Sequence, residues 1–262
     1  MPKVSIITPL YNGGAHIEAC IRSVQAQSLQ DYEHLIIDNK SRDDGVAKVR
    51  DLMRADDRIR LLDCSHAQGA AVTRNVGIDH AQGRYIAFLD CDDRWKPEKL
   101  STQISAMETA NAAFSWTGYD VVGDFGEKLR VQAGEPGDRR DLITKRIVIG
   151  CLTAAYDREL LGLMRMAYTR APEDFCLWVD IMTKMEAEGL AALAIPDSLA
   201  IYRVHSDGAS ADKKKAALAH WRALRAHVGL TRQQAVGAFA SYAIHTIWPR
   251  LKARLQSSGQ SS

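Results

Sequence analysis

The chain has 262 residues, of which 46% are hydrophobic and 25% charged, and its formal net charge is +2. These values are typical of a folded globular protein and exclude a disordered or fibrous chain. We expect neither a signal peptide nor a transmembrane helix, because no charged leader and no membrane-spanning apolar run is present. The five cysteines are scattered without CxxC spacing, which favours reduced thiols in a cytoplasm over disulfides or a zinc site.

The first 111 residues alternate between strand-like and helix-like segments. Short apolar runs predict strands at 4–8, 33–38, 59–62 and 84–89. Helical spacing of apolar residues and helix-start signals predict helices near 17–24, 46–54, 70–81 and 97–111. This alternation is the pattern of βαβ units, so we predict an α/β fold with a mostly parallel, Rossmann-like sheet and helices on both faces.

Beyond residue 111 the alternation is weaker. We predict a helix at 173–188 and strands at 114–119, 147–156, 193–196 and 199–204, with a loop at 123–140. Two further helices, at about 213–228 and 232–254, form a C-terminal helical appendage. The sequence thus predicts one large domain at 1–212, the appendage at 213–255 and a disordered tail at 256–262.

Three aspartates, Asp90, Asp92 and Asp93, directly follow the strand at 84–89. Buried unpaired carboxylates are too costly for a core, so this strand must end at an open edge of the sheet. Extended chain places Asp90 and Asp92 on one side, where they suit Mg²⁺ or Mn²⁺ bound together with substrate phosphates. The alternative is an acidic turn that caps the helix opened by Pro97.

Two other predicted strands also end in unusual polar sequence, at Pro9–Asn12 and at Asp38–Ser41. In parallel α/β sheets the carboxyl ends of the strands meet at one edge, and ligands bind there. We therefore expect both segments to meet the aspartates at a single site.

Four segments in this order resemble family 2 glycosyltransferases. They are Val4–Asn12, Gly69–Asp93, Pro172–Trp178 and Tyr202–Ser206. The resemblance covers about residues 3–210 and implies the GT-A fold, with a nucleotide-binding half at 1–111 and an acceptor-binding half at 112–212. It also implies transfer of a sugar from a nucleotide-diphosphate donor, with inversion at the anomeric carbon.

The resemblance implies a role for individual residues. Asp174 would be the general base, and Asp90, Asp92 and His205 would hold Mn²⁺ or Mg²⁺ or approach it. The residues implied in donor binding are Thr8, Pro9, Tyr11, Asp38, Arg74, Asp90 and Asp93. Structural alternatives stay open: a negative first helical turn at Glu173–Asp174, a surface arginine at Arg74, and a hydrogen-bonding histidine at His205.

The C-terminal appendage differs in charge from the rest of the chain. From Lys213 onward there are nine Lys and Arg residues and no acidic ones, whereas the first 212 residues carry a balance of −7. Apolar residues recur three or four apart at Val236, Phe239, Ala243, Ile247, Leu251 and Leu255. A basic amphipathic helix of this kind is typical of attachment to an anionic membrane surface. The alternative is packing on the catalytic domain or in a dimer.

These observations favour an inverting, metal-dependent glycosyltransferase in the cytoplasm or at the inner face of the cytoplasmic membrane. Its donor would be a UDP-sugar and its acceptor a saccharide or a lipid-linked saccharide in cell-surface polysaccharide synthesis. One alternative is a sugar-nucleotide-forming transferase, which the absence of Lys and Arg in Pro9–Ala15 disfavours. The other is a catalytically silent nucleotide-sugar-binding module, which the intact Asp90, Asp92 and Asp174 disfavour. We expect no nucleic-acid partner.

Overall fold

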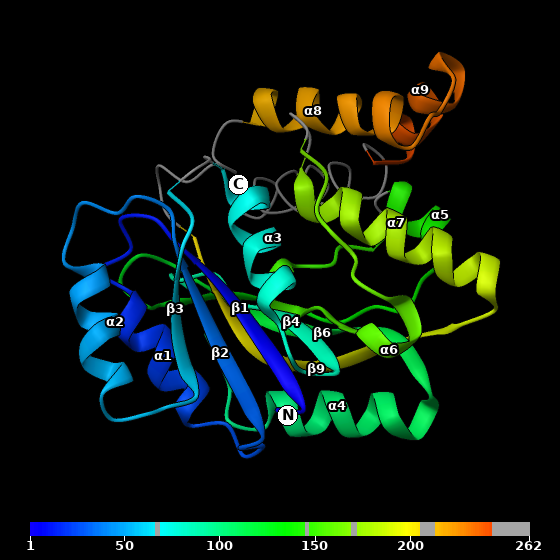
Figure 1. The fold of residues 1–262 in the computed structure, drawn as a ribbon. Coiled ribbons are helices and arrows are strands. Elements are labelled where there is room, and N and C mark those ends of the chain that lie inside the picture. The colour runs from blue at the N-terminus through cyan, green and yellow to red at the C-terminus, as the bar shows by residue number, and fades with distance from the viewer. Residues whose placement is uncertain (66–68, 145–146, 169–171, 205–212, 243–262) are drawn as a thin grey trace, which may run out of the picture.

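A nine-stranded sheet organises the computed structural model, which describes residues 1–65, 69–144, 147–168, 172–204 and 213–242 (Figure 1). Eight strands follow the order β3-β2-β1-β4-β8-β6-β9-β5, and β7 pairs with β6. The strands are β1 (Val4–Leu10), β2 (Tyr32–Asp38), β3 (Ile59–Asp63), β4 (Tyr85–Phe88), β5 (Arg94–Trp95), β6 (Ala112–Val122), β7 (Lys128–Gln132), β8 (Ala155–Asp157) and β9 (Ala191–Arg203).

Helices cover both faces of this sheet. In Figure 1, α3, α5 and α7 lie on one side of the sheet, and α1 and α4 lie on the other. The helices are α1 (Ile17–Gln25), α2 (Gly45–Met53), α3 (Ala70–His80), α4 (Lys99–Ala110), α5 (Arg139–Ile143), α6 (Arg158–Leu161), α7 (Glu173–Glu188), α8 (Lys213–Arg222) and α9 (Arg232–Tyr242), with the short helices η1 (Cys151–Thr153) and η2 (Ala223–His227).

The amino-terminal half of the sheet is parallel, as the alternating sequence predicts. Strand β1 lies between β2 and β4, with Val4 opposite Tyr32 on one side and opposite Tyr85 on the other. Strand β3 extends the same parallel ladder beyond β2. Because these strands run the same way, β1, β2 and β4 end at one edge, which we call the carboxyl edge.

The second half of the sheet departs from the prediction in two places. Strand β8 is antiparallel to both neighbours and is short, so most of the strand predicted at 147–156 is wrong. Strand β9 is continuous where two strands were predicted. It continues past Pro196 because the β6–β9 register shifts at Gly118, where an irregularity accommodates a residue without an N–H. A side chain at Gly118 would contact the Pro196 carbonyl oxygen at 2.7 Å.

The segment predicted as a loop at 123–140 contains β7 and the first residues of α5. Four of the five residues of β7 are exposed. An exposed edge strand need not show the alternation of a half-buried one, so its sequence does not distinguish it from a loop. Helix α5 begins with a capping box, in which Asp138 accepts a hydrogen bond from the Asp141 N–H at 2.8 Å.

The two faces of the sheet carry different core clusters. Ile7 and Ile37 point toward α3 and belong to the cluster that includes Trp178 of α7. Val4 and Ile6, at alternate positions of the same strand, point toward α1 and α4 on the other face. Alternation along one buried strand thus supplies both layers of the fold.

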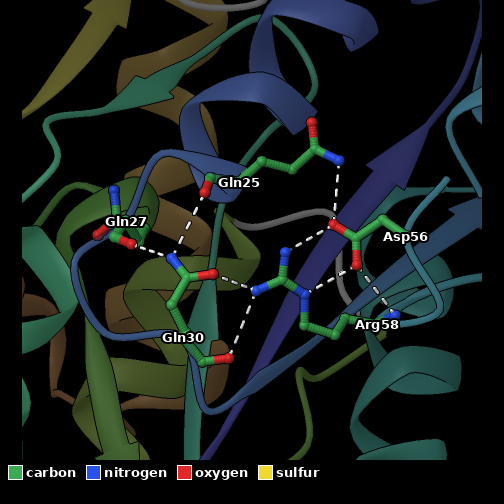
Figure 2. Close-up of polar contacts among 5 residues, drawn as sticks. All are labelled: Gln25, Gln27, Gln30, Asp56 and Arg58. Atoms are coloured by element: carbon green, nitrogen blue, oxygen red, sulfur yellow. Dashed lines mark hydrogen bonds and ion pairs between the residues drawn. The ribbon is translucent and has the colours of Figure 1, made fainter.

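A polar network lies at the amino edge of the sheet, where β2 and β3 begin, and Figure 2 shows its contacts. Arg58 donates to the Asp56 carboxylate at 2.8 Å and to the Gln30 side chain, and Gln25 donates to Asp56 at 3.0 Å. The hydrogen bonds from Arg58 lower the pKa of Asp56 to about 2. Gln30, in turn, donates to the Gln27 carbonyl oxygen. These contacts join the turns that precede β2 and β3.

The described part of the C-terminal appendage, residues 213–242, packs against α7 (Figure 1). His227 contacts the Asp180 carboxylate at 2.8 Å, and the ring of His220 lies 4.8 Å from that of Phe175. Phe239 packs against both His220 and Trp221. From Ala243 onward, the predicted apolar stripe lies outside the residues that the structure describes. No described helix has the length and apolar character needed to cross a membrane.

Candidate active site

A cleft of about 460 Å³ opens at the carboxyl edge of the sheet. It is built by the loops that follow β1, β2 and β4 and by the first turns of α3. The sequence predicted that the three strand ends would converge, and all three contribute to this cleft. Its lining residues are Pro9, Leu10, Tyr11, Asn39, Gly69, Ala70, Thr73, Arg74, Asp90 and Asp92.

The loops after β1 and β2 are held together by hydrogen bonds. The Asn12 N–H donates to the Ser41 hydroxyl at 3.0 Å, and the Arg42 N–H donates to the Asn12 side chain at 2.8 Å. Asn12 has a φ of 50°, a left-handed conformation that asparagine tolerates better than most residues. This turn presents Tyr11, which is 66% exposed, at the rim of the cleft.

Asn39 and Thr73 form a polar wall of the cleft; the sequence placed Asn39 at this edge, within Asp38–Ser41, but did not single out Thr73. The Asn39 side chain is buried and donates to the Thr73 hydroxyl at 2.7 Å, which in turn donates to the Gly69 carbonyl oxygen at 2.9 Å. Asn39 follows β2 directly and Thr73 precedes Arg74. Asn39 belongs to the segment Asp38–Ser41 and Thr73 to the segment Gly69–Asp93. Their contact depends on the packing of α3 on the sheet.

Arg74 is a buried residue of the cleft and not a surface arginine. Its guanidinium forms an ion pair with the Asp90 carboxylate. Burial alone would lower the pKa of Arg74, but the ion pair with Asp90 and the charge of Asp174 outweigh it and raise the pKa. Arg74 is therefore a permanent cation at the cleft, paired with the aspartate that follows β4.

The three aspartates after β4 lie in different surroundings. Asp90 and Asp92 line the cleft, whereas Asp93 is only 2% exposed and accepts a hydrogen bond from the Arg203 N–H at 2.9 Å. Burial, and then the charges of Asp90 and Asp92, raise the pKa of Asp93. Asp93 therefore connects the loop after β4 to the end of β9, away from the cleft.

Two other predicted donor-binding residues do not line the cleft. Thr8 is fully buried, and its hydroxyl lies 2.9 Å from Nε2 of His34. Asp38 is half-buried and accepts a hydrogen bond from the Ser41 N–H at 3.1 Å, which shapes the loop after β2. His205 lies outside the described residues.

Asp174 lies in the first turn of α7 and lines a second, smaller cavity of about 180 Å³. The carboxylate accepts a hydrogen bond from the Phe175 N–H at 2.7 Å. The charge of Asp174 contributes to the raised pKa of Arg74, although the two residues line different cavities. The other lining residues of this cavity are Leu142, Ile147, Val148, Ile149, Pro172, Phe175 and Trp178.

Asn75, next to Arg74, holds the segment before α7 against α3. Its side chain donates to the Met166 carbonyl oxygen at 2.9 Å and accepts from the Met166 N–H at 2.8 Å. The Asn75 side chain thus pairs with both backbone groups of Met166, as one strand pairs with a residue of its neighbour. It connects Met166 to α3 at the residue that follows Arg74.

The carboxylates at the cleft fit a metal ion only if a ligand completes its coordination. In the described ranges no group of three or more His, Cys, Asp and Glu residues is arranged to hold a metal. Mg²⁺ sites in proteins often use one or two carboxylates and take the remaining oxygens from substrate phosphates and water. Asp90 and Asp92 fit that donor set, with Asp90 shared with Arg74.

Comparison with known proteins supports one family throughout the chain. The family model described as glycosyl transferase family 2 matches residues 5–161. The chain is 36% identical to TuaG of Bacillus subtilis, assigned to teichuronic acid biosynthesis, over 95% of this chain and 98% of that protein. It is 34% identical to the Escherichia coli glucosyltransferase WfgD, over 84% of this chain and 85% of that protein.

Solved structures share the fold at lower sequence identity. S. aureus TarS 1–349 with UDP-GlcNAc has a TM-score of 0.68 at 14% identity, covering 92% of this chain and 72% of that one. The mannosyltransferase PcManGT of Pyrobaculum calidifontis, with GDP-Man and Mn²⁺, has a TM-score of 0.67 at 20% identity, covering 100% of this chain and 76% of that one. The likeness confirms the predicted GT-A fold.

Proposed function

This chain belongs to glycosyl transferase family 2 and is a glycosyltransferase, and we propose that it moves a sugar from a UDP-sugar to a lipid-linked saccharide. The relative WfgD is named for UDP-Glc and for α-D-GlcNAc-diphosphoundecaprenol. A Campylobacter jejuni relative, 37% identical over 69% of this chain, is also named for an undecaprenol-linked acceptor. The observation that carries the proposal is the cleft that joins three strand ends to Arg74.

The cleft suits a nucleoside diphosphate at both of its ends. Gly69 and Ala70, at the amino end of α3, line the cleft, where the helix dipole and the first backbone N–H groups of the helix favour phosphate oxygens. Arg74, one turn further along, adds a buried positive charge. Pro9 and Tyr11 supply an apolar wall for the base and ribose. Asp38 directly precedes Asn39, which lines the same cleft.

We assign Asp90 and Asp92 as the carboxylates that hold Mn²⁺ or Mg²⁺ with the donor diphosphate, and His205 as a further ligand. When bound, the metal neutralises negative charge on the departing diphosphate. Arg74 contributes in the same direction from the protein side. Its pairing with Asp90 holds the guanidinium at the cleft before a donor binds, which reduces the reorganisation that the reaction would require.

Asp174 is assigned as the base that accepts the proton of the acceptor hydroxyl. The hydroxyl oxygen forms a bond to the anomeric carbon while the bond from that carbon to the diphosphate oxygen breaks. The electron pair leaves with the diphosphate, and the proton remains on Asp174. Attack from the side opposite the leaving group inverts the configuration, and this direct displacement uses one carboxylate as base.

Product formation with a panel of nucleotide sugars and a lipid-linked acceptor tests this assignment. We expect transfer from a UDP-sugar by the natural chain, and a loss of about 10²- to 10⁴-fold in Asp174→Asn, which cannot accept a proton. Asp180→Asn, on the same helix but in contact with His227, is the matched control and should retain the rate. Binding of the donor without transfer by the natural chain would instead identify a silent binding module.

We also propose that the chain works at the cytoplasmic face of the membrane, held there by residues 213–255. Lipid-linked acceptors are found at a membrane, and each basic residue near an anionic surface contributes about 1 kcal/mol. Flotation with anionic vesicles measures the attachment, with Lys213, Lys214 and Lys215 replaced by Glu as the charge variant. Failure of the full chain to float, or unchanged binding after deletion of 213–262, would exclude this mode of attachment.

A further inference from the structure

An irregular segment that follows α6, residues 162–168, lies against α3, and we call it the strap. On its exposed side, Arg165 forms an ion pair with Asp79 of α3 at 2.6 Å. Met166, the next residue, is only 2% exposed and belongs to the same core cluster as Ile78 of α3. Because the strap has neither helix nor strand, the buried backbone groups of Met166 need partners from another segment.

Asn75 of α3 supplies both of these partners. Its side chain is 3% exposed, donates to the Met166 carbonyl oxygen at 2.9 Å and accepts from the Met166 N–H at 2.8 Å. An amide side chain carries a donor and an acceptor, whereas an ionised carboxylate only accepts and an aliphatic side chain does neither. The two hydrogen bonds therefore fix the backbone of Met166 relative to α3.

The side chain of Met166 reaches the guanidinium of Arg74. The Met166 Sδ lies 4.0 Å from Nη1 of Arg74, whereas Nη2 of the same group pairs with Asp90. Nε of Arg74 is buried and has no hydrogen-bond partner among the residues that the structure describes. Its orientation therefore depends on two contacts, the ion pair with Asp90 and the polarisable thioether of Met166.

We infer that Met166 is a positioning residue for the donor site, which holds the Arg74 guanidinium in the orientation that binds the diphosphate. An arginine side chain has many rotamers, so the ion pair alone leaves the guanidinium free to reorient about Asp90. A group that is already oriented binds its ligand without that entropic cost. Asn75 acts one step further away, by fixing the backbone of Met166. This inference rests on the proposed function and adds to the donor site a residue from the strap.

Calorimetric titration of UDP into the full chain, with Mn²⁺ present, tests the role of Met166. Met166→Ala removes the thioether and leaves the backbone contacts with Asn75, so the Kd for UDP should rise about five- to tenfold. Met166→Leu has a similar volume and covers the guanidinium again, so its Kd should stay within about twofold of that of the natural chain. Asp79→Asn removes the exposed ion pair of the strap and should leave the Kd unchanged.

A double-mutant cycle separates positioning from a loss of stability. Met166→Ala leaves a cavity and lowers the melting temperature, but a stability loss alone does not change the Kd of a chain that is still folded. In Arg74→Met the group to be positioned is absent, so adding Met166→Ala should change the Kd by less than about twofold. Asn75→Ala keeps the methionine and releases its backbone, and it should show the same dependence on Arg74.

The outcomes distinguish this inference from the proposed function. An unchanged Kd in folded Met166→Ala would overturn the inference, as would equal losses from Met166→Ala in the natural and Arg74→Met chains. Either result would leave the proposed function standing. Should Met166→Ala not fold, Met166→Val, whose shorter side chain lacks the sulfur, is measured in its place with the same expected rise. Absence of UDP binding to the natural chain would contradict the proposed function itself.

Discussion

Arg74 is a buried residue of the cleft and forms an ion pair with Asp90, which follows β4. Replacing Arg74 by Met should raise the Kd for the donor by about 30-fold, corresponding to about 2 kcal/mol, because a buried counter-charge to the diphosphate is lost. Arg74→Lys keeps the charge but not the fork of donors, so its effect should be intermediate. Calorimetry with UDP measures both, and equal affinity in Arg74→Met and the natural chain would refute this role.

His34 is buried in β2 of the sheet, and it makes the stability of the protein depend on pH. Burial lowers the pKa of His34 to about 3, so the folded chain does not take up the proton that the unfolded chain binds below its ordinary value of 6.5. Stability should therefore fall as the pH decreases from 6.5 toward 3, by about 2 kcal/mol at pH 5. Urea unfolding at pH 7 and pH 5 should show a smaller loss in His34→Gln, which keeps a polar partner for Thr8. An identical loss in both proteins would count against this explanation.

At the scale of elements, the close approach of α3 to β1 depends on Gly77. A Cβ added at Gly77 would lie 2.6 Å from the Cγ2 of Ile7 and 2.9 Å from the Cδ1 of Ile37. Gly77→Ala should therefore destabilise the fold by about 1 to 3 kcal/mol, although alanine is the better helix former. The matched control is Gly237→Ala in α9, where nothing lies within 4 Å. Thermal unfolding should show the control unchanged or stabilised, and a stabilised Gly77→Ala would mean that α3 is not so tightly packed.

The network around Asp56 fixes two turns at the amino edge. Because Arg58 holds the pKa of Asp56 at about 2 instead of its ordinary 3.8, its stabilisation is complete above pH 4 and is lost as the pH falls toward 2. Asp56→Asn should cost about 1 to 2 kcal/mol at pH 7, since the exposure of Arg58 reduces the effect. The cost should disappear near pH 2. A cost that is constant across this range would indicate a packing effect and not a charge effect.

The parallel half of the molecule was predictable from sequence because its signals are local. Buried strands such as β1 read as uninterrupted apolar runs, and the residues that follow them are too polar to continue into a core. That reasoning placed Tyr11 and Asp90 at a common edge without any knowledge of contacts. The same local signals fail for β7, whose exposed residues resemble a loop, and for β9, whose continuity past Pro196 depends on the partner strand.

The finer arrangement of the site could not be read from the sequence, because it depends on turns and packing. Asp93 turns inward because its N–H bonds to the Asp90 carbonyl oxygen at 3.0 Å, which ends the alternation of the strand. Asn39 and Thr73 meet only after α3 packs on the sheet. The roles of Asp174 and His205 remain predictions, and Asp174 lines the second cavity and not the cleft of Asp90 and Asp92.

At the scale of the whole molecule, the account depends on three strand ends and one helix forming a diphosphate site that a divalent cation completes. Calorimetric titration of UDP into the full chain, with and without Mn²⁺, tests this most directly when the natural chain is compared with Asp92→Asn. We predict that Mn²⁺ tightens UDP binding by at least about tenfold in the natural chain and has no such effect in Asp92→Asn. Equal tightening in both proteins, or no UDP binding to the natural chain, would contradict the account.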